Sequence, residues 1–160
     1  MEGFRKARQL GLHITVHAAE SGPAANVQQA IEELGAERIG HGYHVVEDEH
    51  HYELAKRKGV HFEVCPSSSV YTNSATFDKH PVKRFAADGV SFSLNSDDPS
   101  VIECDLTGEY DLAATQLGLT TQQLVQSVRN AAKAAFLPTD EKEDLLKTLE
   151  EKLAQFEKEK

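Results

Sequence analysis

Four short apolar runs, separated by amphipathic segments, constrain the fold of this chain most strongly. The runs are rich in Val, Ile, Phe and Leu, and each is bounded by Gly, Pro, Ser or Asp, which is typical of buried β-strands. They are HITVHA (13–18), RIGHG (38–42), VHFEVCP (60–66) and VSFSLNSD (90–97). Apolar residues at helical spacing and a final glycine characterise the segments between them, which are 24–35, 47–59 and 79–89. This order predicts an α/β fold with about four parallel strands and right-handed crossovers.

The sequence after the fourth run is helical in pattern. A helix is expected over 106–118, and Thr120 can cap the next one, with Gln123 completing a capping box. Pro138 ends that helix, and a last amphipathic helix follows it. We therefore expect a helical C-terminal region over 106–158, and a single domain comprising residues 1–160.

Charge and composition exclude several classes of partner. The net charge of −9 disfavours nucleic acid and anionic membrane surfaces. No stretch approaches the roughly 20 apolar residues that cross a bilayer, and the first residues lack the apolar core of a signal peptide. Cys65 and Cys104 form no C-x-x-C pair. These features predict a cytoplasmic protein with reduced thiols.

Titratable residues follow three of the four predicted strands. His17 and Glu20 follow the first, His41 ends the second, and Asp97 and Asp98 end the fourth. In a parallel α/β protein, the carboxyl ends of the strands share the face where ligands bind. We therefore expect these five side chains to converge on one site.

Each of these residues also has a purely structural interpretation when taken alone. His17 and Glu20 could be a core histidine and a surface glutamate, and S-D-D-P is good turn chemistry. The glycines on both sides of His41 indicate a positioned side chain. Alternation along a strand would direct Asp97 and Asp98 to opposite sides, one toward a metal and the other toward a substrate. Together the residues favour a metal-assisted hydrolase, in which the metal acidifies a bound water.

At this level of detail the chain resembles the adenosine deaminases of the amidohydrolase superfamily. The matching motifs occur in the family's order, and a C-terminal region is similar as well. The motifs are VHAAES, ERIGHGYH, HFEVCPSSS and SLNSDDPS, and the C-terminal region is NAAKAAFLPTDEK. The resemblance covers essentially all 160 residues, and it implies hydrolysis of adenosine or 2'-deoxyadenosine to inosine or 2'-deoxyinosine plus ammonia.

The resemblance also implies a role for each candidate residue. His17 and Asp97 would be metal ligands for Zn2+, and Glu20 would protonate the purine ring at N1. His41 would orient and stabilise the attacking hydroxide, and Asp98 would hydrogen-bond the purine at N7. The partner is thus a small-molecule purine nucleoside.

The implied family fold is a (β/α)8 TIM-type barrel, which typically needs about 250 residues. Four strands and extra C-terminal helices correspond to its C-terminal half. The family's H-x-H zinc ligands are absent from this sequence, so the zinc site is incomplete within it. We expect weak zinc binding, little activity of the chain alone, and self-association or complementation through the exposed half-barrel. Two alternatives stay open: a related amidohydrolase acting on adenine or AMP, and a catalytically inactive fragment.

Overall fold

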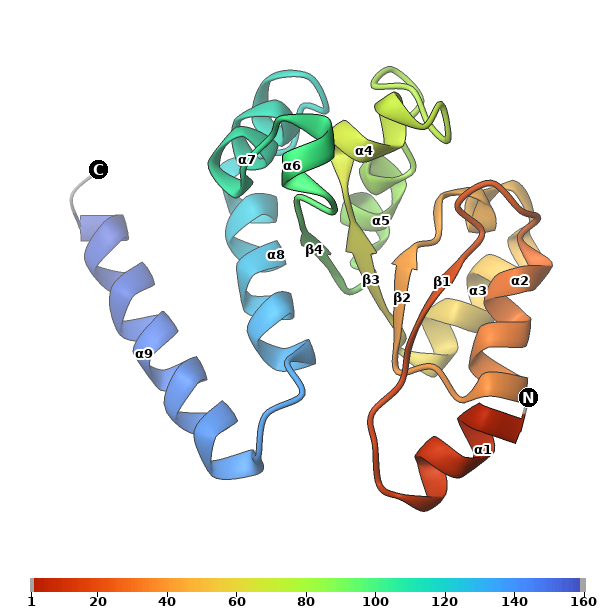
Figure 1. Cartoon of the computed structure of the whole chain (residues 1–160). Helices are drawn as coiled ribbons and strands as arrows, with labels where there is room; N and C mark the ends of the chain where they lie inside the picture. Colours follow the sequence, from red (N-terminus) through yellow and green to blue (C-terminus); the bar gives the residue numbers. More distant parts are fainter. Residues whose placement is uncertain (1, 159–160) are drawn as a thin grey trace.

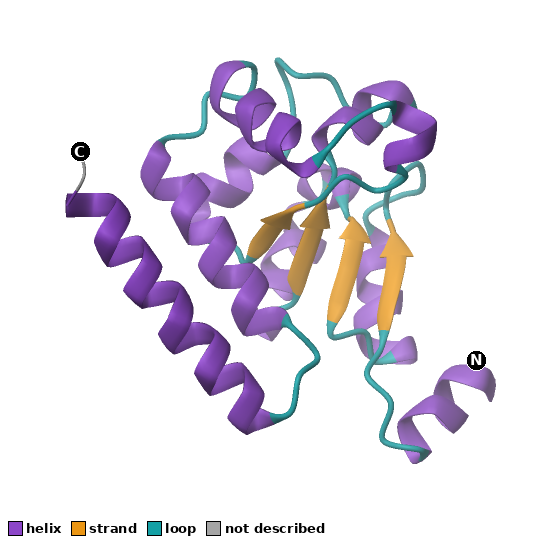
Figure 2. Ribbon diagram, turned by 60° about the vertical axis from the view of Figure 1, so that its left-hand side comes forward, coloured by secondary structure: helices purple, strands orange, loops and turns teal. Residues whose placement is uncertain are grey.

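The computed structural model describes residues 2–158 and shows one parallel sheet of four strands in the order β1-β2-β3-β4 (Figure 2). The strands are β1 (Thr15–Ala18), β2 (Arg38–His41), β3 (His61–Val64) and β4 (Phe92–Leu94). All four lie within the predicted runs, and the parallel α/β prediction is confirmed. The fourth run is much longer than its strand, because β4 ends at Leu94 and does not continue to residue 97.

Helical segments precede, connect and follow the strands (Figure 1). In the first half these are α1 (Glu2–Gln9), α2 (Ala25–Gln29) with its π-helical continuation η1 (Ala30–Leu34), the 3-10 helix η2 (Tyr43–Glu47) and α3 (Glu49–Lys58). In the second half they are α4 (Pro66–Tyr71), α5 (Val82–Asp88), α6 (Pro99–Ile102), α7 (Leu106–Thr115), α8 (Thr121–Ala134) and α9 (Thr139–Lys158). The predicted capping box of Thr120 and Gln123 opens α8.

One face of the sheet is apolar and is covered by helices. The strand register aligns Val16, Ile39, Phe62 and Phe92 across the four strands, so these side chains share a face. The ring of Phe62 stacks on Phe85 of α5, with 4.7 Å between the ring centroids. Helices α2, α3 and α5 lie on this side of the sheet (Figures 1 and 2).

The opposite face of the sheet is polar. Thr15 Oγ1 donates a hydrogen bond of 2.9 Å to Glu63, and Arg38 Nε lies 3.3 Å from the same carboxylate. His61 contacts the hydroxyl of Ser93 at 3.0 Å. The strands in the structure are therefore amphipathic. Their apolar sequences had instead indicated strands that are buried on both faces.

The C-terminal helices extend the molecule beyond β4. Helix α8 packs beside β4, and α9 packs on α8 (Figure 1). Arg129 of α8 holds Glu150 of α9 through two hydrogen bonds of 2.7 and 2.9 Å. The leucine-rich face of α9 is only partly covered, since Leu145 and Phe156 remain exposed. No helix within residues 2–158 is long and apolar enough to cross a membrane.

Candidate active site

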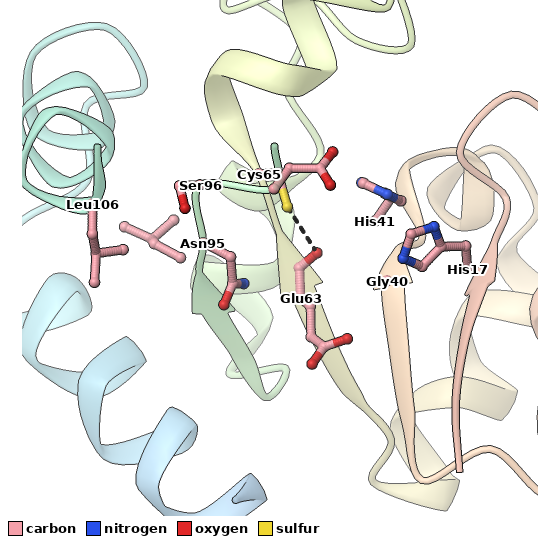
Figure 3. Close-up of a pocket in the computed structure, with 10 residues that line it drawn as sticks. His17, Gly40, His41, Glu63, Cys65, Asn95, Ser96 and Leu106 are labelled. Carbon is pink, nitrogen blue, oxygen red and sulfur yellow. Dashed lines mark hydrogen bonds between the residues drawn. The ribbon is translucent and has the colours of Figure 1, made fainter. Parts of the chain in front are cut away.

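A pocket of about 370 Å³ opens where the strands end (Figure 3). Its walls come from all four strands and the loops that follow them. The lining residues are His17, Gly40, His41, Glu63, Cys65, Leu94, Asn95, Ser96, Asp97 and Leu106. The structure therefore brings three of the five candidate residues, His17, His41 and Asp97, to one pocket.

The glycines on both sides of His41 make room for neighbouring rings, and His41 pairs with His17. The rings meet edge to face with their centroids 4.6 Å apart. A Cβ on Gly40 would overlap the ring of His17, and a Cβ on Gly42 would overlap the buried ring of Phe62. His41 itself has φ +66°, a left-handed conformation that costs a non-glycine residue free energy and that often occurs at functional sites.

Glu20 lies beside these histidines on the loop after β1. Its Oε2 atom is 3.8 Å from His41 Nε2, and its side chain is 28% exposed. Potential metal-ligating atoms of His17, Glu20 and His41 all lie within 4.8 Å of one another. Glu20 is thus placed next to His41, although it is not among the residues that line the pocket.

Asp97 belongs to a second group of possible metal ligands. Its carboxylate lies within 4.8 Å of donor atoms of both His41 and Cys65, and His41 is shared by the two groups. Asp97 Oδ2 also accepts a hydrogen bond of 2.6 Å from Ser68 Oγ, which fixes the direction of the carboxylate.

Asp98 does not line the pocket in the described part of the chain. It is exposed, as His17 and Asp97 also are, and it precedes α6 as its N-cap without a side-chain hydrogen bond. The expected strand alternation of Asp97 and Asp98 is wrong, because both residues lie beyond Leu94 in a turn. The two carboxylates are separated instead by that turn, in which Asp97 has φ +56°.

Burial shifts the pKa values of two side chains that line the pocket. Burial lowers the pKa of His41, partly against the charge of Glu20, which raises it. Burial also raises the pKa of the Cys65 thiol, so this cysteine stays protonated. The hydroxyl of Tyr43 lies 3.0 Å from the backbone N of Cys65 and 3.3 Å from His41 Nδ1.

The serines after β3 hold the pocket wall together and do not line the pocket with His17 and His41. Ser67 donates its backbone N–H to Glu109 Oε2 at 3.0 Å, and Glu109 is fully buried on α7. Ser69 Oγ donates to the Pro66 carbonyl at 2.6 Å and contacts His80 Nε2 at 3.1 Å. Helix α4 is thus anchored on both sides, which positions Ser68 against Asp97.

Sequence reasoning missed several residues around this pocket, among them Glu63, Tyr43 and Glu109. Glu63 could have been found, because it is a charge inside an apolar strand, on the same face as His17. Tyr43 is adjacent to the IGHG motif, but nothing in the sequence links it to Cys65. Glu109 carries no sequence signal, since acidic residues are common on helix surfaces.

A comparison with protein families matches residues 1–152 to the family model described as "Adenosine deaminase". Adenosine deaminase of Xenopus tropicalis is 44% identical over 152 residues, covering 94% of this chain and 42% of the relative. Adenosine deaminase of Gallus gallus is 42% identical over 150 residues, covering 92% of this chain and 42% of the relative. The chain thus spans about two fifths of the length of the curated relatives it matches.

Solved structures of deaminases and of a related amidohydrolase are also similar to this chain. An adenine deaminase from Arthrobacter aurescens superposes with a TM-score of 0.88 at 26% identity, covering 94% of this chain and 46% of the other. An amidohydrolase from Burkhoderia ambifaria with bound Zn superposes with a TM-score of 0.79 at 27% identity, covering 96% of this chain and 46% of the other. The Arabidopsis protein ADAL, complexed with GMP, superposes with a TM-score of 0.80 at 26% identity, covering 92% of this chain and 43% of the other. Coverage of less than half of each neighbour is consistent with half of a barrel.

Proposed function

The chain belongs to the adenosine deaminase family, and on that premise we propose that its pocket serves the hydrolytic deamination of adenosine or 2'-deoxyadenosine to inosine or 2'-deoxyinosine and ammonia. The observation that carries the proposal is the meeting of His17, His41 and Asp97 in one pocket, with Glu20 3.8 Å from His41. These side chains come from three different strand ends, and their convergence favours a functional role over a purely structural one.

The donor types around the pocket suit zinc, and His17 and Asp97 belong to two groups of possible ligands that share His41. His17 and Asp97 would hold it, and their imidazole and carboxylate groups are ordinary zinc ligands. A neighbouring amidohydrolase with bound Zn supports this part of the proposal. When bound, zinc acidifies water and so supplies a nucleophile at neutral pH. Catalytic zinc usually has three protein ligands, so these two residues form an incomplete set.

The remaining residues have roles in binding and proton transfer. Glu20 would hold the proton that is delivered to purine N1. Its half-buried carboxylate lies 3.8 Å from His41, which lines the pocket. His41 would orient the attacking water or hydroxide through a hydrogen bond with its ring. Asp98, exposed just beyond the pocket, would hydrogen-bond N7 of the bound purine.

Adenine and AMP are the alternative substrates within the same chemistry. The superposition on an adenine deaminase supports adenine as the second candidate. The superposition on ADAL complexed with GMP supports a nucleotide such as AMP as the third candidate.

The test is conversion of adenosine to inosine by the purified chain with added zinc, beside an Asp97→Ala variant. Asp78→Ala is the matched control, because Asp78 is an exposed aspartate that hydrogen-bonds only locally, to Thr76. Activity that is lost in Asp97→Ala and kept in Asp78→Ala supports the proposal, and a panel of adenosine, adenine and AMP identifies the substrate. Adenosine turnover that is unchanged in Asp97→Ala would contradict the role of that residue. Absence of turnover in all three proteins would favour the inactive alternative.

We also propose that the chain is cytoplasmic and associates with a second copy of itself. Cys65 and Cys104 are both free thiols, as in proteins of reducing compartments. Within the described residues, β1 and β4 each pair with one strand only, and unpaired strand edges favour association. Light scattering on the purified chain tests this, and a stable monomer at micromolar concentration would contradict it.

A further inference from the structure

The hydroxyl of Tyr43 joins three groups at the back of the pocket. It donates to the Cys65 carbonyl at 3.1 Å and accepts from the Cys65 backbone N–H at 3.0 Å. Its third neighbour is His41 Nδ1 at 3.3 Å. Tyr43 and His41 are both only 2% exposed, so water does not readily replace any of these partners.

The number of protons available decides how these groups are arranged. A tyrosine hydroxyl has one proton to donate, and it can accept from two donors. If that proton goes to the Cys65 carbonyl, the hydroxyl can accept from both the Cys65 N–H and a protonated His41 Nδ1, and all three contacts are hydrogen bonds. If the proton goes to His41 Nδ1 instead, the contact with the Cys65 carbonyl is lost as a hydrogen bond. Buried polar groups favour the arrangement with more bonds.

The other ring nitrogen of His41 gives independent support. His41 Nε2 is 3.8 Å from Glu20 Oε2, a separation too long for a direct hydrogen bond. A protonated Nε2 facing a carboxylate would be drawn to hydrogen-bond distance, whereas an unprotonated Nε2 has nothing to donate. The gap is also suited to a donor, such as water, placed between the two acceptors.

We propose that Tyr43 is a positioning residue that holds neutral His41 in its Nδ1–H tautomer and so presents an unprotonated Nε2 to the pocket. In this form His41 accepts a hydrogen bond from water and can take its proton, which is the property a general base requires. The tautomer is a property of the folded chain, and only its use in deamination rests on the proposed function.

A second buried histidine, His80, carries its proton on the other ring nitrogen and so provides an internal reference. The backbone N–H of Val82 donates to His80 Nδ1 at 3.2 Å, and a backbone amide can only donate. His80 must therefore carry its proton on Nε2, from which it donates to Ser69 Oγ at 3.1 Å. One spectrum should then contain both tautomers, assigned to two identified residues.

The test is two-dimensional long-range proton–nitrogen NMR of the chain labelled with ¹⁵N-histidine, at a mildly alkaline pH where the imidazoles are neutral. Loss of signals in His41→Asn and in His80→Asn assigns the two rings. In the wild-type chain, His41 should show an N–H type Nδ1 and an unprotonated Nε2, with the reverse pattern at His80. An N–H type Nε2 at His41 would overturn the proposal without any variant.

Tyr43→Phe then tests the cause, since it removes the hydroxyl and keeps the ring. His41 should shift toward the Nε2–H form or a mixture of both forms, while His80 keeps its pattern. Tyr52→Phe is the matched control, because Tyr52 is also fully buried but hydrogen-bonds Asp88, remote from His41. An unchanged His41 in folded Tyr43→Phe, or an equal change in Tyr52→Phe, would refute the role of Tyr43. These results are independent of turnover, so failure of the deaminase assay leaves them standing.

Discussion

Replacing Gly42 with alanine should destabilise the chain through two separate effects. Gly42 has φ +72°, and a side chain in this left-handed region costs about 1–2 kcal/mol. The added Cβ would also overlap the ring of Phe62, which is fully buried and stacked on Phe85. Overpacking of this kind costs about 1–3 kcal/mol, because the ring cannot leave the core. The total loss of unfolding free energy should be about 2–5 kcal/mol.

Gly59→Ala separates the two effects. Gly59 has φ +64°, but no heavy atom lies within 4 Å of the Cβ it would gain. Its replacement should therefore cost only the conformational part, about 1–2 kcal/mol. Urea denaturation followed by circular dichroism gives both values from the midpoints, provided that the slopes agree. Equal losses in the two variants would refute the argument that Phe62 closes the space beside Gly42.

Three further perturbations follow from contacts around the pocket. Ser68→Ala removes the hydroxyl that directs Asp97, so zinc affinity should fall about 10–100-fold with little change in stability. Chelator competition measures this affinity, and an unchanged value would contradict the positioning role. Glu109→Ala leaves the part-buried N–H of Ser67 unpaired and opens a cavity on α7, which should cost about 2–4 kcal/mol in the same urea assay. A loss below about 1 kcal/mol would show that α4 does not depend on this anchor. Burial lowers the pKa of His61 and of His80 to about 4. As the pH falls, these histidines take up protons in the unfolded chain before they do so in the folded chain. The free energy of unfolding should therefore decline between about pH 6.5 and pH 4, by up to about 3 kcal/mol per histidine. A His80→Asn variant should show a shallower acid decline, and an identical pH profile would refute this cause.

The sequence predicted the strands because their signals are local. Runs such as 38–42 carry their own boundaries, and the capping box at Thr120 is complete within four residues. The last strand was overestimated, because the predicted run included Asn95, Ser96 and Asp97, which are residue types that favour turns. The chain instead turns at Asp97 to reach α6.

Long-range contacts account for what the sequence did not reveal. Helix α4 depends on the bond from Ser67 to Glu109, 42 positions further along the chain. The link between Tyr43 and Cys65 joins the ends of β2 and β3, and no spacing rule predicts it. His17 and His41 were found because they end neighbouring strands, whereas their contact through the space at Gly40 is a tertiary feature.

The order of strands in the sheet matches their order along the chain. Each strand therefore docks on the one that precedes it, and no later segment has to insert between two earlier strands. Each closure spans 23 to 30 residues, so it costs less chain entropy than the pairing of more distant strands would. During synthesis, β1 and β2 can pair before β3 and β4 have left the ribosome, so the sheet can grow by addition at one edge. Residues of the pocket rim would then assemble in sequence, with the carboxylate of Asp97 arriving last on the already paired imidazoles of His17 and His41.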